Sequence, residues 1–176
     1  MLAGGRSSRM GRDKAGLVWG NGQTFLDRSI ALLGEAGCAR VIVSGNRPCY
    51  DHVPDLQPHL GPMGGIASIL VRRPELGGTL LIVPVDMPHL VSDDLTPLVS
   101  AAASHDGSRF TTTPLPMALS ANPRIRRIIV ALLNQQDLAL RNLANHLDLA
   151  SVEPTSDRLS GNINSPDDYR LASDNP

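Results

Sequence analysis

Short, continuous apolar runs alternate with helical patterns along most of this 176-residue chain. The clearest runs are residues 41–43 and 80–83, and residues 1–3 form a shorter one. Runs of this kind, bounded by turn-forming residues, are typical of parallel strands that are buried on both faces. We therefore predict an α/β fold with three layers, α/β/α, in which helices cover both faces of a Rossmann-like, mainly parallel sheet. One such domain is expected to span residues 1–176.

Four helices are predicted from capping residues and apolar periodicity. Thr24 is expected to cap the first helix, and Pro62 lies in the opening turn of the second. The third begins near Ser92 or four residues later, and the fourth follows Asn122 with apolar residues at amphipathic spacing. Residues 109–120 contain two prolines, which cannot donate to a central ladder, so this segment is expected to form an irregular strand pair near a sheet edge.

The composition argues against several classes of protein. With 16 basic and 17 acidic residues, the net charge of -1 provides no electrostatic footprint for nucleic acid or an anionic membrane. Aromatic residues make up only 3% of the chain, which argues against a surface that stacks single-stranded bases. No apolar run approaches the ~20 residues of a membrane span, and the first residues do not have a signal-peptide pattern. Cys38 and Cys49 are too few for a disulfide framework, so we predict a cytoplasmic protein with reduced thiols.

A glycine-rich segment, residues 2–14, directly follows the first apolar run. Its glycines allow backbone N–H groups to approach phosphate oxygens, and Arg9 and Lys14 supply the cations that a triphosphate requires. The segment has neither the Walker A spacing nor the glycine fingerprint of a dinucleotide fold. It is interpreted as a phosphate-binding loop, with a flexible basic turn as the alternative.

Asp86 follows the apolar run 80–85, so its carboxylate is expected at the carboxyl end of a parallel strand, where α/β sheets bind their ligands. Magnesium prefers one or two protein oxygens together with phosphate and water. Asp86 is therefore a candidate Mg²⁺ ligand. The alternative is a turn in which its side chain caps backbone N–H groups.

Four motifs, in order along the chain, resemble those of the MobA-like nucleotidyltransferases. Residues 2–14 are similar to the family's Leu-Ala-Gly-Gly, Ser-Arg-Met-Gly and Asp-Lys elements around the triphosphate. Residues 61–66 resemble its Gly-Pro-Leu-Ala-Gly motif, and residues 83–88 its metal-binding aspartate motif. Residues 162–168 are similar to its C-terminal Asn-x-Asn-Thr-Pro-Glu-Asp. The resemblance thus covers nearly the whole chain.

The resemblance implies a nucleotide-diphospho-sugar transferase type of fold and a magnesium-dependent transferase activity. The intact Leu-Ala-Gly-Gly and Gly-Pro-x-x-Gly elements favour the guanine-using branch, in which GMP moves from GTP to the terminal phosphate of molybdopterin. Pyrophosphate leaves and the guanine dinucleotide form of the cofactor results. The implied partners are GTP, molybdopterin, and molybdoenzymes or other proteins of cofactor biosynthesis, with no nucleic acid and no membrane.

The family's phosphate-binding residues carry over onto the first and third motifs. The nucleotide is expected to contact Leu2, Ala3, Gly4, Gly5, Lys14 and Asp86. Lys14, Arg9 and Asp86 are the catalytic residues that the resemblance implies, because the two cations steady the triphosphate charge and the carboxylate holds Mg²⁺. Asn164 is expected to lie beside Asp86 as a second metal ligand.

Selection of the base is expected from the loops after the second strand. Guanine presents two adjacent donors, N1–H and the exocyclic amine, and a carboxylate can accept from both. The resemblance assigns this role to Asp55, with Asn46 as a further contact, whereas an Asx turn is the alternative for each residue alone. Asp51 is a rival to Asp55. Asn162, together with Asn164, is expected to contact substrate.

Two departures from the family pattern bear on function. Relatives carry several more apolar residues before Leu-Ala-Gly-Gly, so either the start of this chain is placed too late or its first strand is a stub. The family's His-Pro-Leu or Gln-Pro-Leu element is approximated by residues 113–115. The competing hypotheses are cytidylyl transfer to molybdopterin, nucleotidyl transfer to a sugar or alcohol phosphate, and a nucleotide-binding protein that has lost turnover.

Overall fold

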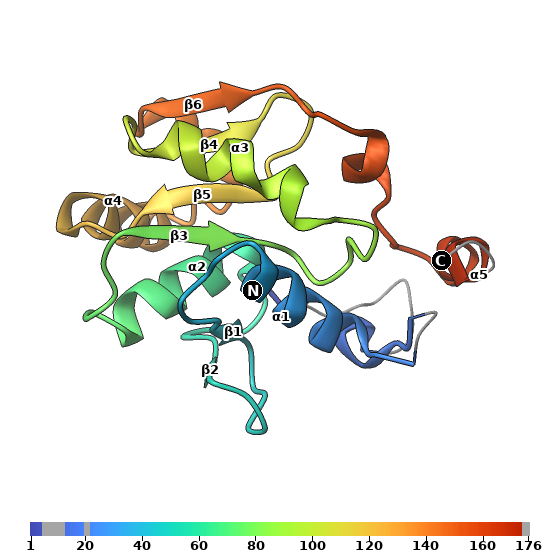
Figure 1. Ribbon diagram of the computed structural model, residues 1–176. Helices are drawn as coiled ribbons and strands as arrows, with labels where there is room; N and C mark the ends of the chain where they lie inside the picture. Colours follow the sequence, from blue (N-terminus) through green and yellow to red (C-terminus); the bar gives the residue numbers. More distant parts are fainter. Residues whose placement is uncertain (5–12, 20–21, 174–176) are drawn as a thin grey trace.

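The computed structural model describes residues 1–4, 13–19 and 22–173, and its strands form two groups (Figure 1). Four strands pair in the order β3–β5–β4–β6, and two more form the parallel pair β1–β2. The bounds are β1 Val43–Ser44, β2 His52–Val53, β3 Thr79–Ile82, β4 Gly107–Phe110, β5 Met117–Ser120 and β6 Leu149–Val152.

Residues 1–3 join the two groups into one layer. Leu2 forms parallel bridges to Ser44 and to Pro84. Its N–H donates to the carbonyl of Val83 at 2.8 Å, and the N–H of Ala3 donates to the carbonyl of Ser44 at 3.2 Å. Among the described strands, β5 runs antiparallel to both of its neighbours, whereas the other recorded strand pairings are parallel. The prediction of a mainly parallel sheet is therefore confirmed.

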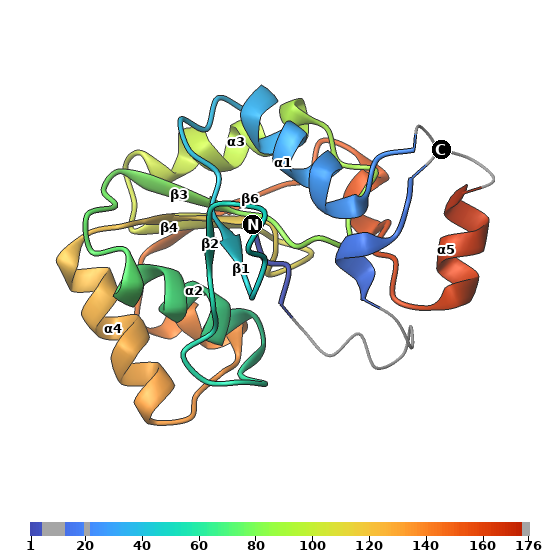
Figure 2. The same ribbon diagram turned by 90° about the horizontal axis from the view of Figure 1, so that it is seen from below.

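Helices cover both faces of this layer, as predicted. Figure 2 shows α1 and α3 over one face and α2 and α4 over the other. The α-helices are α1 Phe25–Glu35, α2 Gly61–Arg72, α3 Ser92–Ala102, α4 Pro123–Asn134 and α5 Pro166–Ser173. Short 3₁₀ helices occupy η1 Lys14–Gly16, η2 Leu140–Asn145 and η3 Asp157–Ser160.

The predicted capping residues are confirmed. The hydroxyl of Thr24 accepts a hydrogen bond from the N–H of Asp27 at 3.0 Å, and the Asn122 side chain accepts from the N–H of Ile125 at 2.9 Å. Helix α3 begins at Ser92, where the Asp94 carboxylate accepts from the N–H of Val91. The alternative start four residues later is wrong, because the helix has already formed there.

The predicted strand pair in residues 109–120 is found, since β4 and β5 pair antiparallel, but neither strand forms an end of the four-stranded sheet. Strand β5 lies between β3 and β4, and β4 lies between β5 and β6. Pro114 and Pro116 precede β5 in the connection from β4, so neither proline occupies the central ladder. Prolines in a connection do not interrupt the hydrogen bonds of the strand that follows, so they are compatible with a central β5.

Two clusters of buried apolar residues, one on each side of the sheet, fix the layers. Phe25, Leu95 and Leu98 pack beneath α1 and α3, and Ile66 and Ile129 pack beneath α2 and α4. Burial of each such side chain contributes about 1.5–3 kcal/mol to stability. Packing on both faces therefore fixes the sheet, and the strands fix the positions of the loops at their carboxyl ends.

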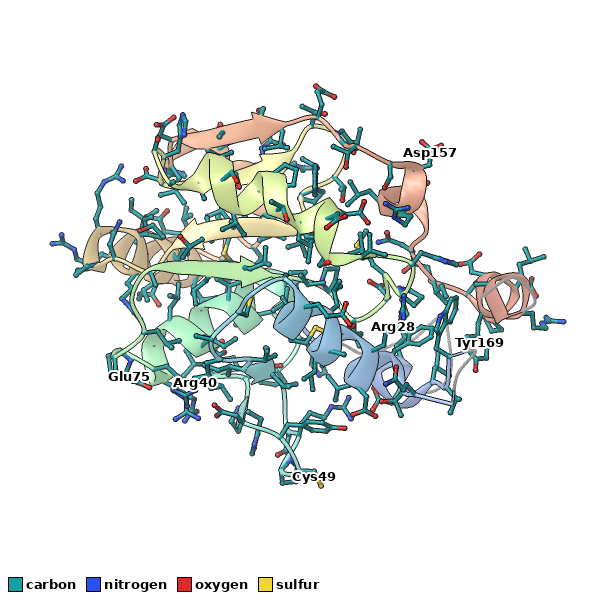
Figure 3. All side chains as sticks on the ribbon, in the orientation of Figure 1. Arg28, Arg40, Cys49, Glu75, Asp157 and Tyr169 are labelled. Atoms are coloured by element: carbon teal, nitrogen blue, oxygen red, sulfur yellow. The ribbon has the colours of Figure 1, made fainter. Side chains whose placement is uncertain are left out.

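Helix α5, near the C-terminus of the chain, packs against residues from the N-terminal part. The hydroxyl of Tyr169 donates to the carbonyl of Val18 at 2.6 Å, and its ring makes an edge contact with Phe25 at a centroid distance of 5.9 Å (Figure 3). This contact holds the C-terminal motif beside the segment that contains η1. In the described part of the chain, no helix has the length and apolar character needed to cross a membrane.

Candidate active site

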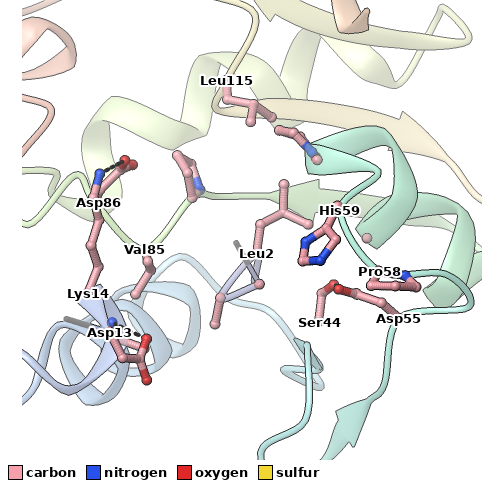
Figure 4. Close-up of a pocket in the computed structure, with 17 residues that line it drawn as sticks. Leu2, Asp13, Lys14, Ser44, Asp55, Pro58, His59, Val85, Asp86 and Leu115 are labelled. Atoms are coloured by element: carbon pink, nitrogen blue, oxygen red, sulfur yellow. Dashed lines mark hydrogen bonds and ion pairs between the residues drawn. The ribbon is translucent and has the colours of Figure 1, made fainter. Parts of the chain in front are cut away.

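A cavity of about 560 Å³ opens at the carboxyl ends of the central strands (Figure 4). Six residues singled out from the sequence line it: Leu2, Ala3, Gly4, Lys14, Asp55 and Asp86. Figure 4 shows Lys14 and Asp86 at one end and Ser44, Asp55 and His59 at the other, with Leu2 between them. We call these two regions the Lys14 end and the Asp55 end.

Three segments meet at the Lys14 end. The ammonium nitrogen of Lys14 lies 2.9 Å from Oδ2 of Asp86 and 2.9 Å from Oδ1 of Asn164. The side chains of Lys14 and Asp86 are 14% and 19% exposed, so water screens this ion pair only in part. Lys14 is also the only lysine in the sequence. The predicted proximity of these three residues is therefore found in the structure.

Asp13 and Arg47 fix the segment that carries Lys14. The Asp13 carboxylate caps η1 by accepting from the N–H of Ala15 at 3.2 Å. Arg47, in the loop after β1, donates to the same carboxylate at 2.8 Å. That hydrogen bond holds the pKa of Asp13 below its ordinary value. The lysine therefore projects from a turn that is tied to a neighbouring loop.

The C-terminal motif is attached to Asp86 through its backbone. The N–H of Ile163 donates to the carbonyl of Asp86 at 2.8 Å. The Asp168 carboxylate accepts from the N–H groups of Asn164 and Ser165 at 2.9 and 2.8 Å, and these bonds lower the pKa of Asp168. Asn164 thus has a fixed backbone beside the metal-ligand candidate.

A buried carboxylate anchors the segment that leads into this motif. Asp94, 1% exposed at the start of α3, accepts from Arg158 at 2.8 and 2.9 Å and from the hydroxyl of Ser156 at 2.7 Å. Burial alone would raise the pKa of Asp94, but the hydrogen bonds from Arg158, the N–H of Val91 and Ser156 together lower it. This cluster connects the sheet-packing helix α3 to the chain that carries Asn164.

The Asp55 end is built from close packing around one carboxylate. The hydroxyl of buried Ser44 donates to Oδ1 of Asp55 at 3.3 Å. A Cβ at Gly4 would lie 3.2 Å from Oδ2 of Asp55, and a Cβ at Gly65 would lie 2.6 Å from the hydroxyl of Ser44. A side chain at position 65 would therefore displace the hydroxyl of Ser44. These contacts fix where the carboxylate lies.

The rival residue Asp51 lies outside this cavity. Its carboxylate accepts from Arg40 at 2.7 Å and from Arg73 at 2.9 Å, and the hydrogen bond from Arg40 lowers its pKa. It is not among the residues that line the cavity. The geometry therefore favours Asp55 over Asp51 as the carboxylate that faces a ligand.

Some predicted residues are not brought into the cavity. Asn46, Asn162 and Asn164 are exposed and do not line it, although Asn164 contacts the lining residue Lys14. Gly5 and Arg9 lie outside the described residues. Leu115, from the segment that approximates the family's proline-leucine element, does line the cavity.

Sequence reasoning assigned no individual role to four contributors to the site: Asp13, Ser44, Arg47 and Gly65. Ser44 directly follows the apolar run 41–43, so the rule that identified Asp86 at a strand end could also have found it. Nothing in the sequence indicated that Arg47 pairs with Asp13, because 34 positions separate them. Tertiary packing alone creates that contact.

The Lys14 end suits a hard divalent cation that takes further ligands from phosphate. Within the described ranges, no three His, Cys, Asp or Glu side chains come together as a metal cluster. The carboxylate of Asp86 and the amide oxygen of Asn164 nevertheless converge on one cationic atom. Two protein oxygens of this kind match Mg²⁺, which is usually bound by few side chains and by substrate oxygens.

Comparison with known sequences identifies a family and a close relative. The family described as the MobA-like NTP transferase domain matches residues 1–149. A protein named molybdenum cofactor guanylyltransferase from Xanthomonas euvesicatoria pv. vesicatoria (strain 85-10) is 40% identical over 181 aligned residues. The alignment covers 100% of this chain and 94% of that protein.

Solved structures share the fold. Molybdopterin-guanine dinucleotide biosynthesis protein A from Archaeoglobus fulgidus superposes with a TM-score of 0.76 at 18% identity, covering 98% of this chain and 95% of that one. The 2-C-methyl-D-erythritol 4-phosphate cytidylyltransferase from Thermus thermophilus gives 0.69 at 16% identity, covering 98% and 96%. At identities this low, the comparison shows that both structures share the fold of this chain and nothing more.

Proposed function

The chain belongs to the MobA-like NTP transferase family, and from this premise we propose that it is a molybdenum cofactor guanylyltransferase. It transfers GMP from GTP to the terminal phosphate of molybdopterin, releases pyrophosphate and forms the guanine dinucleotide cofactor. The observation that carries this proposal is the convergence of Lys14, Asp86 and Asn164 at one end of a cavity whose other end holds Asp55.

The Lys14 end is proposed to bind the triphosphate. Nucleotidyl transfer needs an in-line attack of a phosphate oxygen on the α-phosphorus, and positioning and charge neutralisation account for most of its catalysis. Lys14 would neutralise developing charge on the phosphates, and backbone N–H groups near Gly4 would hold the outer phosphates. Gly5 is proposed to contribute its backbone N–H in the same way, and Arg9 to neutralise phosphate charge together with Lys14.

Asp86 and Asn164 are proposed to hold Mg²⁺. Around the cavity, the described acidic side chains Asp13, Asp55 and Asp86 outnumber the basic side chains Lys14 and Arg47. A polyphosphate placed among them needs additional positive charge. The bound cation would supply that charge and polarise the phosphate under attack.

The Asp55 end is proposed to select guanine. The two oxygens of Asp55 can accept from N1–H and from the exocyclic amine, a pair of adjacent donors that neither adenine nor cytosine presents. The hydrogen bond from Ser44 and the close approach of Gly4 fix the orientation of the carboxylate. Asn46, exposed at the following loop, is proposed as a further base contact.

The acceptor is proposed to be molybdopterin, bound near Asn162, Asn164 and the lining residue Leu115. The attacking phosphate must reach the α-phosphorus beside Lys14 and Asp86, and Asn164 already lies there. A cytoplasmic location, and contacts with molybdoenzymes or other cofactor-biosynthesis proteins, follow as parts of the same proposal.

The decisive experiment is pyrophosphate release from the purified protein with Mg²⁺, molybdopterin and either GTP or CTP. The proposal expects release with GTP that depends on molybdopterin. Release only with CTP, or only with a sugar or alcohol phosphate as acceptor, would assign the protein to another branch. Binding of GTP in a thermal-shift assay without any pyrophosphate release would identify a nucleotide-binding protein without turnover.

A further inference from the structure

Lys14 occupies the position between the two proposed metal ligands. Its ammonium nitrogen is 2.9 Å from a carboxylate oxygen of Asp86 and 2.9 Å from the amide oxygen of Asn164. The contact with Asp86 is partly shielded from water, since the two side chains are 14% and 19% exposed, whereas the contact with Asn164 is exposed. The two oxygens that would bind Mg²⁺ therefore already share a positive charge supplied by the protein.

The backbone of each member is held by contacts that do not involve the lysine ammonium group. Lys14 projects from η1, which Asp13 caps. The backbone carbonyl of Asp86 accepts from Ile163, and the backbone of Asn164 is held by Asp168. Because the backbone positions are set elsewhere, exchange of partners requires only rotation of the flexible lysine side chain.

A divalent cation and the ammonium group compete for the same oxygens. In the described residues no third acidic or histidine side chain joins Asp86 in a metal cluster that could outweigh this competition. A triphosphate changes the balance in two ways. It offers oxygens that accept from Lys14, and it offers oxygens that complete the coordination of the metal.

We propose that Lys14 closes the metal site of the free protein, so that the divalent cation binds tightly only together with the nucleotide triphosphate. On arrival of the triphosphate, the lysine moves from Asp86 and Asn164 to the phosphates, and the cation takes its place. This inference rests on the proposed function only in taking Asp86 and Asn164 as the metal ligands. It makes Lys14 a control on the order of binding as well as a phosphate ligand.

The test measures Mn²⁺ binding, by electron paramagnetic resonance of the free ion, to the full chain without nucleotide. Lys14→Met removes the charge and keeps an unbranched apolar side chain, so it is expected to bind Mn²⁺ roughly tenfold more tightly than the wild type. Adding Asp86→Asn to that variant should return binding to the weak wild-type level. Arg170→Met removes an exposed cation from α5 and should leave Mn²⁺ binding unchanged.

Equal Mn²⁺ affinities of the wild type and Lys14→Met would overturn the inference, as would an equal gain in Arg170→Met. A second measurement does not need the variant to fold. Because Lys14 is the only lysine, NMR of protein labelled at the lysine side-chain nitrogen gives one lysine signal. Mg²⁺ alone should leave this signal in place, and Mg²⁺ with a non-hydrolysable GTP analogue should move it. A full shift with Mg²⁺ alone would also contradict the inference.

These outcomes are separable from the proposed function. Mn²⁺ affinity in the absence of nucleotide does not depend on which base or acceptor the protein uses. A gain in Lys14→Met without guanylyl transfer by the wild type would sustain the inference and reject the function. Guanylyl transfer by the wild type, without a gain in Mn²⁺ affinity in Lys14→Met, would support the function and reject the inference.

Discussion

The two ends of the cavity are assembled in different ways. At the Lys14 end, the contact between Lys14 and Asn164 joins residues 150 positions apart in the sequence. At the Asp55 end, the contact between Ser44 and Asp55 joins residues only 11 positions apart. The first contact therefore depends on the docking of both terminal segments, whereas the second forms within a short stretch of chain.

This difference predicts different sensitivities. A perturbation of the C-terminal segment should weaken metal and phosphate binding and leave the selection of the base intact. A change at Ser44 or Asp55 should alter the selection of the base and leave the metal requirement intact. Substitutions at the two ends should therefore change either the metal requirement or the base preference, but not both.

The largest effect is expected at the Lys14 end, from Lys14→Ala. Loss of the only lysine removes a cation placed against developing phosphate charge, so kcat/KM for GTP should fall about 10²- to 10³-fold. The side chain lies at the cavity, so the melting temperature should change little. Steady-state pyrophosphate release and thermal unfolding measure the two quantities. Arg170→Ala, an exposed change, serves as the control, and near-wild-type turnover in Lys14→Ala would reject the assigned role.

The next effect concerns the anchor of the C-terminal segment. Asp94→Ala removes a buried carboxylate that accepts from Arg158, Ser156 and the N–H of Val91. Loss of these bonds should lower the free energy of unfolding by about 3 kcal/mol. Folded protein should need more Mg²⁺ for half-maximal turnover, with unchanged preference for GTP. Asp93→Ala, at the exposed neighbouring position, is the matched control and should cost no more than about 0.5 kcal/mol.

The same carboxylate gives a pH dependence with a defined sign. The hydrogen bonds lower the pKa of Asp94 in the folded state below the ordinary value, which is about 3.9. Its contribution to stability is therefore fully present above about pH 4 and is lost as the pH falls through the folded-state pKa. Urea unfolding at pH 7 and pH 3 should show the gap between wild type and Asp94→Ala narrowing at the lower pH. A gap that widens would contradict this account.

A smaller effect is expected at the Asp55 end, from Asp55→Asn. The amide nitrogen would face the donors of guanine in place of an acceptor, so kcat/KM for GTP should fall about 100-fold. The requirement for Mg²⁺ should stay as in the wild type. Asp51→Asn is the matched control, since that residue pairs with Arg40 and Arg73 outside the cavity. Altered base preference in Asp51→Asn alone would reverse the assignment.

Features that depend on local sequence patterns could be predicted from the sequence. Lys14 and Asp86 were found because each belongs to a local pattern, a glycine-rich segment after a strand and a carboxylate after an apolar run. The helices were found because their caps at Thr24 and Asn122 are local features. The placement of Asn164 beside Asp86 was implied by the family resemblance, since nothing in residues 162–168 taken alone indicates where they dock.

Contacts between residues far apart in the chain could not be predicted from the sequence. The pair of Arg47 with Asp13 and the cluster of Arg158 around Asp94 depend on contacts across 34 and 64 positions. Pro114 and Pro116 favour an edge position for residues 109–120, but both precede β5, which pairs on both sides. Periodicity and propensity describe segments, whereas these features arise from the order in which segments pack.

The smallest effect is expected from Ser44→Ala, which probes how finely the Asp55 end is fixed. The hydroxyl donates to Asp55 at 3.3 Å, which is near the long limit for such a bond. Its loss should weaken GTP binding by only about 1 kcal/mol, because the carboxylate is held less firmly in its orientation. We expect KM for GTP to rise about fivefold with kcat and the Mg²⁺ requirement unchanged. Gly65→Ala provides the matched test, because its Cβ would push the same hydroxyl out of place. If either variant instead lowered kcat and raised the Mg²⁺ requirement, the two ends would be coupled, and the separation argued from their assembly would be wrong.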